Sequence, residues 1–214
     1  MDMAKYPIYL EMSGRRAVVI GAGAVAVRKV QTLAEAGARV TVVAEHFLPG
    51  VEETFLEAHV ETVVSRYHKD FLVAATLVIA ATNNNELNRR IYADCQELEV
   101  LCNVVDQPLL CDFFVPAVVK RGDLQIAIGT DGNCPAYAGH LRQKLEEMFT
   151  ETHGHFVDEL EKVRSRIIAE ISDSDRRKAL LGKLASDEAF DYFTQHGQDR
   201  WHHHANDMIH SAPL

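Results

Sequence analysis

The feature that most constrains the fold is a glycine-containing turn near the N-terminus of the chain. A short apolar run, residues 17–20, enters this turn, and a helix-forming stretch, residues 25–35, leaves it. Gly21 and Gly23 lie in the turn, and the small residue Ala26 follows them. An apolar run, a glycine turn and a helix in this order predict the start of a β-α-β unit.

Strand-like runs continue along the first half of the chain. Gly37 ends the first helix, and the β-branched run 39–43 completes the first β-α-β unit. Three more apolar runs alternate with stretches that are compatible with helices or loops: residues 60–64, 76–81 and 100–105. Continuous apolar runs are typical of buried parallel strands. Strands separated by helices in this way predict an α/β fold with a Rossmann-type, doubly wound parallel sheet.

The pattern changes at Asp112, where two strand-like runs follow one another with no helix between them. These runs are residues 113–119 and 124–128, and the turn-forming residues 120–123 join them. This arrangement predicts a β-hairpin outside the parallel sheet.

The sequence pattern from Pro135 onward predicts helices. Apolar side chains recur there at helical spacing and form one face: Phe156, Leu160, Val163, Ile167 and Ile171. Residues 172–175 form a break with helix-capping side chains before the next helix. We therefore expect a Rossmann domain at residues 1–112, a hairpin-plus-helix segment at 113–150 and a helical C-terminal domain at 151–214.

Composition and charge exclude several classes of protein. With 47% hydrophobic and 25% charged residues among 214, the chain is globular rather than disordered. Its 31 acidic and 22 basic residues give a net charge of −9, which argues against nucleic-acid binding. The longest strongly apolar run, residues 71–81, is about half of the roughly 20 residues that a membrane-spanning helix needs. We therefore expect no membrane helix.

The cysteines and the first residues bear on the compartment. Cys95, Cys102, Cys111 and Cys134 form neither a C-x-x-C pair nor a zinc pattern, and the N-terminus has no apolar signal-peptide core. We expect reduced thiols in the cytoplasm, and none of the four cysteines is assigned a functional role.

The glycine turn itself predicts a dinucleotide site. In a turn of the type G-x-G-x-x-G/A the first Gly makes the bend, the second lets the backbone approach a pyrophosphate, and a small third residue allows close packing. Gly21, Gly23 and Ala26 occupy these places, and Ala24 and Val25 open the helix whose N-terminus faces the phosphates. The alternative is a turn that serves packing alone.

Two later positions extend the cofactor prediction. Glu45, just after the second strand, is the nearest carboxylate that can bind the ribose, or it is a solvated loop charge. No arginine follows it directly to bind a 2′-phosphate, so NAD is favoured over NADP. Thr82 and Asn83 follow the fourth strand and either hydrogen-bond the nicotinamide ribose or cap the next helix. Both interpretations can hold together.

Several motifs in order along residues 5–150 resemble the siroheme synthase N-terminal family. These are Tyr6-Pro-Ile-Tyr-Leu, the glycine turn with Arg28-Lys29, Ala-Ala-Thr82, Asn103-Val-Val-Asp106, Phe113-Phe-Val-Pro116, and the 124–128 strand running into Thr130 and Pro135. The resemblance implies a Rossmann module that binds NAD, a segment that forms a strand-exchanged homodimer, and a helical segment that closes over a tetrapyrrole. It also implies oxidation of precorrin-2 to sirohydrochlorin, and in bifunctional members insertion of Fe²⁺.

The resemblance assigns the catalytic role to Asp106. A carboxylate at the carboxyl end of a parallel strand is well placed to accept the proton that is lost as hydride departs. The alternative is an Asp that caps the turn before Pro108. By alignment Thr130 stands where the family often has a Ser, and its hydroxyl is a candidate substrate contact, although the loop around it differs from the family's Ser/Gly-rich version. Among the basic residues, Arg142 and Lys144 are the candidates for binding substrate carboxylates.

The remaining features are the histidines. The run His202–His204 can bind a transition metal, but three consecutive histidines do not share one helix face. We therefore interpret it as an exposed tail and predict no metal site. The rival to an enzyme is a non-catalytic NAD-sensing module, which needs the glycine turn but has no need of Asp106.

Overall fold

The computed structural model describes residues 5–211. The chain forms two compact units, Met1–Val115 and Pro116–Leu214. No helix in the described part of the chain has the length and apolarity that crossing a membrane requires.

The first unit is a parallel sheet of five strands, in the order β3-β2-β1-β4-β5. The strands are β1 (Arg16–Ile20), β2 (Arg39–Ala44), β3 (Glu61–Val64), β4 (Leu77–Ala80) and β5 (Leu101–Val104). The helices are α1 (Ala24–Glu35), α2 (Val51–Glu57) and α3 (Asn85–Glu97), with the short 3₁₀ helices η1 (Lys69–Leu72) and η2 (Pro108–Leu110). The predicted doubly wound sheet is confirmed. Because the strand order reverses between β1 and β4, a ligand crevice is expected at their carboxyl ends.

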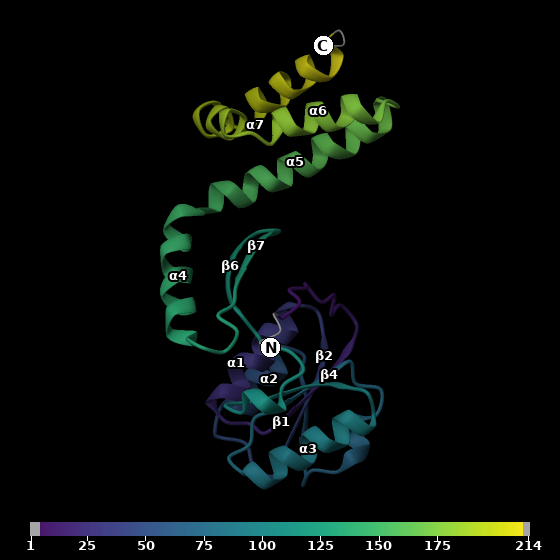
Figure 1. Cartoon of the computed structure of the whole chain (residues 1–214), viewed down its shortest axis with the longest axis vertical. Coiled ribbons are helices and arrows are strands. Elements are labelled where there is room, and N and C mark those ends of the chain that lie inside the picture. Colours follow the sequence, from purple (N-terminus) through teal and green to yellow (C-terminus); the bar gives the residue numbers. More distant parts are fainter. Residues whose placement is uncertain (1–4, 212–214) are drawn as a thin grey trace. The chain divides into compact units, whose positions relative to one another are not determined.

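Helices cover both faces of this sheet (Figure 1). Alternate residues of one strand point to opposite faces, so Val19 packs with the side of α1 and α2 while Val18 packs with the side of α3. Val30 and Phe55 are fully buried on the first side, and Ile91 on the second. Burial on both faces explains why the strands are continuous apolar runs.

The second unit begins with an antiparallel hairpin and continues as helices. The hairpin is β6 (Ala117–Arg121) and β7 (Leu124–Ile128), followed by α4 (Pro135–Met148), α5 (Glu151–Glu170), α6 (Ser174–Leu184) and α7 (Asp187–His210). The hairpin is confirmed, but its first strand starts at Ala117 rather than at residue 113. Pro116 directly precedes it, and a proline has no N–H to donate to a ladder.

The last three helices share an apolar core that includes the predicted stripe on α5. Trp201 of α7 is fully buried in it, and Asp173 caps α6 through a hydrogen bond from the Arg176 backbone N–H, as the 172–175 break predicted. The interpretation of His202–His204 as an exposed tail was wrong, because this run lies inside α7. Trp201, Ala205 and Ile209 are spaced by four residues and anchor that helix in the core.

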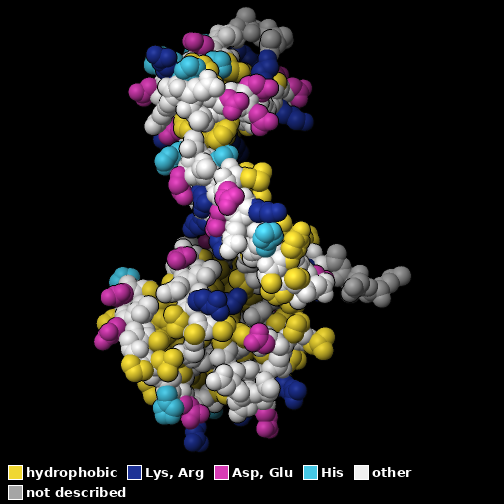
Figure 2. Space-filling view, turned by 90° about the vertical axis from the view of Figure 1, so that its left-hand side faces the viewer, with side chains coloured by type: hydrophobic (Ala, Val, Ile, Leu, Met, Phe, Trp, Pro, Cys, Tyr) yellow, Lys and Arg dark blue, Asp and Glu magenta, His cyan; other side chains and the backbone are white. Residues whose placement is uncertain are grey.

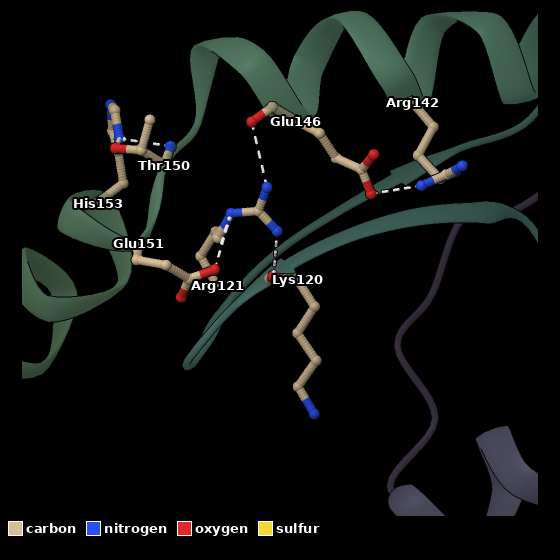
Figure 3. Close-up of polar contacts among 7 residues, drawn as sticks. All are labelled: Lys120, Arg121, Arg142, Glu146, Thr150, Glu151 and His153. Atoms are coloured by element: carbon tan, nitrogen blue, oxygen red, sulfur yellow. Dashed lines mark hydrogen bonds and ion pairs between the residues drawn. The ribbon is translucent and has the colours of Figure 1, made fainter.

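The end of the hairpin packs where α4 passes into α5 (Figure 3). Arg121 donates to the backbone carbonyl of Glu146 at 3.1 Å and pairs with Glu151 at 3.3 Å. A Cβ added at Gly154 would lie 2.6 Å from the Arg121 carbonyl oxygen, so the helix backbone approaches the strand closely there. Thr150 and His153 form a capping box at the start of α5.

Candidate functional site: a pocket at the carboxyl ends of β1, β4 and β5

A pocket of about 640 Å³ opens in the first unit beside the glycine turn. Its lining comes from the segments that follow β1, β4 and β5: Gly23, Ala24, Val25, Ala81, Thr82, Asn83, Asn85, Asn88, Arg89, Val105, Asp106 and Gln107. The pocket therefore lies at the carboxyl edge of the sheet, next to the point where the strand order reverses.

The two glycines of the turn have different surroundings. Gly21 has φ +109°, and a Cβ on it would lie only 2.4 Å from the carbonyl oxygen of Ala81, so this position requires glycine for both conformation and space. Gly23 lines the pocket, and a Cβ on it would meet no atom within 4 Å. Its bare backbone thus borders open space, as a pyrophosphate site requires.

The start of α1 adds a positive partial charge to this wall of the pocket. Gly23 is the N-cap residue and offers no side-chain cap, and the first turn contains no acidic residue. The first intrahelical bond runs from Val27 N to Gly23 O at 3.1 Å. The preceding N–H groups of the helix therefore have no intrahelical acceptor, and such groups favour a bound anion.

The segment after β4 is held by a small polar network. Thr82 Oγ1 lies 2.6 Å from Asn88 Oδ1, and Asn88 Nδ2 donates to the Thr82 carbonyl at 3.0 Å. Asn84 caps α3 by accepting from the backbone N–H groups of Glu86 and Leu87. The helix-capping interpretation of this stretch thus holds for Asn84. Thr82 and Asn83 line the pocket, which leaves them available for a ligand as well.

Asp106 lies at the third position of a turn after β5, closed by a hydrogen bond from Gln107 N to Val104 O at 3.3 Å. Its φ is +59°, which is uncommon for a residue other than glycine. The residue is exposed and lines the pocket. The alternative role of Asp106, as a cap for the turn before Pro108, is not seen. The N-cap residue of η2 is Gln107, and no side chain caps that helix.

Glu45 does not line the pocket. It directly follows β2, is exposed, and lies 3.6 Å from the guanidinium of Arg66, which is exposed as well. Sequence reasoning overlooked Arg66, because this residue comes from the next strand-to-helix connection and nothing in its spacing points to Glu45.

The three residues predicted to bind substrate all belong to the second unit. Thr130 accepts a hydrogen bond from the Cys134 backbone N–H at 3.2 Å and so holds the loop before α4. Arg142 pairs with Glu146 one turn further along the same helix, as Figure 3 shows. Lys144 is exposed.

Three polar residues of the pocket were missed by sequence reasoning as ligand groups: Asn85, Asn88 and Gln107. Asn85 and Asn88 lie on the first turns of α3, as does Arg89, which was one of several basic residues considered for the substrate carboxylates but not favoured. Arg89 brings a cationic side chain to the pocket. A signal was present in the helical spacing from the Asn84 cap, which places Asn88 one turn later.

Within residues 5–211, no group of three or more His, Cys, Asp or Glu side chains could hold a metal ion. The histidines of α7 instead make protein contacts. His202 Nε2 lies 2.5 Å from the buried carboxylate of Glu159, and His204 stacks on Tyr192. Figure 2 shows acidic, basic and histidine side chains mixed over the helices of the second unit.

Two family models match the chain. One, described as "Putative NAD(P)-binding", covers residues 8–117, and the other, described as "Sirohaem biosynthesis protein central", covers residues 121–148. The first model spans the parallel sheet with its pocket, and the second spans the end of β6, β7 and α4.

Two curated relatives are both named siroheme synthase. The protein from Thioalkalivibrio sulfidiphilus is 32% identical over 91% of this chain and 40% of its own length. The protein from Methylobacillus flagellatus is 34% identical over 82% of this chain and 38% of its own length. The chain thus spans about two fifths of these relatives.

Among solved structures, "SirC, precorrin-2 dehydrogenase" matches with a TM-score of 0.78 at 21% identity, over 95% of this chain and 100% of that one. This likeness establishes a common fold across both units. Together with the NAD(P)-binding model and the two siroheme synthases, it confirms the predicted resemblance: the chain belongs to the siroheme synthase N-terminal family.

Proposed function

We propose that this chain is an NAD-dependent precorrin-2 dehydrogenase, which oxidises precorrin-2 to sirohydrochlorin in sirohaem biosynthesis. The observation that carries the proposal is the pocket in which the open face of Gly23, the end of β4 and Asp106 meet. The family model contributes the NAD(P)-binding character, and the solved neighbour contributes the reaction that its name states.

The pocket fits a dinucleotide. Gly23 leaves room for the pyrophosphate against the backbone, and the N–H groups at the start of α1, including those of Ala24 and Val25, suit its charge. Gly21 supports the turn without lining the pocket. Asn83 and Thr82 are the residues that we assign to the nicotinamide ribose, because they line the pocket after β4.

We assign the adenosine ribose to Glu45, although its carboxylate has Arg66 as a neighbour. A carboxylate accepts hydrogen bonds from a ribose diol and repels a 2′-phosphate, which favours NAD over NADP. Comparing NADH and NADPH formation at equal cofactor concentrations tests this assignment. The proposal predicts faster turnover with NAD, and equal or faster turnover with NADP contradicts it.

Asp106 is the proposed proton acceptor. NAD supplies the hydride acceptor, so the substrate loses a hydride to the cofactor and a proton to a base. Among residues 5–211, no side chain forms a hydrogen bond or ion pair with the Asp106 carboxylate, which leaves both oxygens available. A base in hydrogen-bond reach accelerates such a step by about 10²–10⁴-fold.

The substrate is a polycarboxylate macrocycle, which calls for cationic and hydroxyl partners. Arg89 is a cation at the pocket itself, and Lys144 is exposed on α4. Arg142 is also assigned to a substrate carboxylate, which would replace Glu146 as its partner. Thr130 is assigned as a hydroxyl contact from the loop before α4. Guanidinium groups suit this task because they bind carboxylates through two parallel hydrogen bonds.

A homodimer in the cytoplasm is part of the proposal. The hairpin sheet has two strands, and the side chain of Val118 is 37% exposed on it. A second copy of the chain can add strands to this sheet and cover Val118. The four cysteines are free, as in proteins of reducing compartments.

The direct test is incubation of the purified protein with precorrin-2 and NAD, following NADH absorbance and the appearance of sirohydrochlorin. The proposal predicts both products in equal amounts. Absence of NADH overturns it. A thermal-shift titration with sirohydrochlorin separates the enzyme from an NAD-sensing module, because only the enzyme binds the tetrapyrrole.

A further inference from the structure

The segment that carries Asp106 is a short loop tied together at its base. Asn103 and Cys111 form an antiparallel bridge across the two ends of the loop. The backbone N–H of Asp112 donates to the Cys102 carbonyl at 2.8 Å, and the Cys102 N–H donates to the Asp112 carboxylate at 2.8 Å. The chain therefore leaves β5 and returns to it at a defined place.

Asp106 needs such support because of its backbone conformation. With φ +59° it occupies the left-handed region, which Asp adopts more readily than most residues but which remains less stable than the usual backbone conformations. The turn from Val104 to Gln107 has a backbone hydrogen bond of 3.3 Å, which is long for an N–H donor. A further contact is needed to hold this turn firmly.

The thiol of Cys111 supplies that contact. Its Sγ lies 3.3 Å from the carbonyl oxygen of Val104 and 3.4 Å from that of Gln107, so one S–H proton serves both ends of the turn. Asn103 Nδ2 donates to the same sulfur at 3.4 Å and to the Phe113 carbonyl at 2.8 Å. Asn103 is buried, and the hydrogen bond from its side-chain amide restricts the position of the sulfur.

The thiol is in the right protonation state for this role. Burial raises the pKa of Cys111 above its usual value, and the nearby Asp112 carboxylate also raises it, while the Lys29 ammonium lowers it by a smaller amount. At neutral pH the sulfur therefore retains its hydrogen and can donate it.

We propose that Cys111 is a positioning residue: its S–H group joins both ends of the 104–107 turn and thereby sets the direction of the Asp106 carboxylate in the pocket. Asn103 assists by holding the sulfur. The proposal rests on the proposed function, since it gives the positioned carboxylate its task.

Three substitutions separate hydrogen bonding from space filling. Cys111→Ser retains a donor, Cys111→Val fills the space without a donor, and Cys111→Ala removes both. Cys134→Ala is the matched control, because Cys134 is exposed and lies in the second unit. We expect kcat to fall about tenfold or more in the Val and Ala variants and to stay within about threefold in the Ser variant and the control. The KM for NAD should stay within about twofold in all of them.

A second measurement does not depend on activity. The Gln107 amide closes the turn, so its hydrogen-exchange rate, measured by NMR on each variant, reports the state of the turn. We expect faster exchange in the Val and Ala variants and wild-type exchange in the Ser variant. The acidic limb of the pH–kcat profile, which reports the base, should shift in the same two variants.

The outcomes are distinct. Unchanged kcat in the Val and Ala variants overturns the positioning role, whether or not exchange accelerates. Unchanged exchange overturns the claim that the thiol holds the turn. If the wild type forms no NADH from precorrin-2, the proposed function fails, while the exchange rates still decide whether Cys111 holds the turn. If the Ala variant does not fold, the Ser and Val variants carry the same comparison.

Discussion

At the scale of single residues, the glycine turn shows how one sequence motif contains two different requirements. The fold itself requires glycine at position 21, because the positive φ and the close approach of Ala81 exclude a side chain there. Gly23 is under no such constraint in the protein alone, since open space lies beyond it. Its lack of a side chain matters for the ligand that we propose.

The pair of substitutions Gly21→Ala and Gly23→Ala tests this difference. Gly21→Ala should destabilise the fold by about 1–3 kcal/mol from backbone strain alone, with the steric conflict at Ala81 in addition. Gly23→Ala should leave the unfolding temperature near that of the wild type but raise the Kd for NAD by about tenfold, which corresponds to roughly 1.4 kcal/mol.

Thermal unfolding and a fluorescence titration with NAD give the two quantities. A Gly23→Ala protein that binds NAD as tightly as the wild type would exclude the assigned pyrophosphate position. A Gly21→Ala protein of unchanged stability would mean that the close approach to Ala81 is easily relieved.

Much of the pocket was predictable at this scale, because the roles of glycine and of strand-end polar residues follow from local geometry. Gly23, Thr82 and Asn83 were found in this way, whereas Asp106 came from the family resemblance. All four line the pocket. The polar residues of α3 were not, since which face of a helix borders a pocket depends on how the helix packs. The network around Cys111 was hidden because two of the groups that contact its sulfur are backbone carbonyls, of Val104 and Gln107, which no pattern of side chains reveals.

At the scale of elements, the parallel strands were predictable because each is buried on both faces and therefore continuously apolar. The hairpin start was misplaced because the run 113–119 is apolar across Pro116, which a strand ladder does not accommodate well. The prediction for the histidine run was wrong because three consecutive histidines do not by themselves distinguish an exposed tail from one turn of a helix. The apolar stripe of Trp201, Ala205 and Ile209 decides that this segment is a helix.

The helical core contains a buried carboxylate whose contribution depends on pH. Burial by itself would raise the pKa of Glu159, but hydrogen bonds from Lys162 at 2.7 Å and His202 at 2.5 Å outweigh it and lower the pKa below its usual value of 4.5. A lowered pKa in the folded state stabilises the protein above the usual pKa. That contribution is lost as the pH falls through the folded-state value.

Glu159→Gln should therefore lower the free energy of unfolding at neutral pH by about 1.5–3 kcal/mol, the range for hydrogen bonds to a charged group. The difference from the wild type should shrink as the pH falls below 4.5. Urea unfolding at several pH values measures it, and Glu161→Gln is the control because Glu161 is an exposed residue of the same helix. A difference independent of pH would show that the charge of Glu159 plays no part.

At the scale of the whole molecule, the chain consists of two units, and only the first contains the pocket. The net charge of −9, which argued against nucleic-acid binding, also means that a polyanionic substrate requires local cations. Arg89 brings one to the pocket. The proposed homodimer came mainly from the family resemblance, because residue patterns alone do not specify how copies of a chain would assemble.

The proposed homodimer has its own test. Light scattering should give twice the chain mass of 23.9 kDa. Val118→Lys should yield the monomer, since it places a charge on the hairpin sheet. Ile168→Lys should remain dimeric, because Ile168 is an exposed apolar residue on α5, outside the hairpin. A wild-type protein with the mass of one chain, or a dimeric Val118→Lys variant, contradicts this interface.

The central claim is that Asp106 accepts the proton of precorrin-2 oxidation in an NAD-binding pocket. Asp106→Asn is the sharpest probe, because asparagine tolerates the same left-handed backbone and removes only the base. The decisive measurement is NADH formation from precorrin-2 by this variant, together with its Kd for NAD. Our account predicts that kcat falls about 10²–10⁴-fold while the Kd for NAD is unchanged. Turnover near that of the wild type would contradict it.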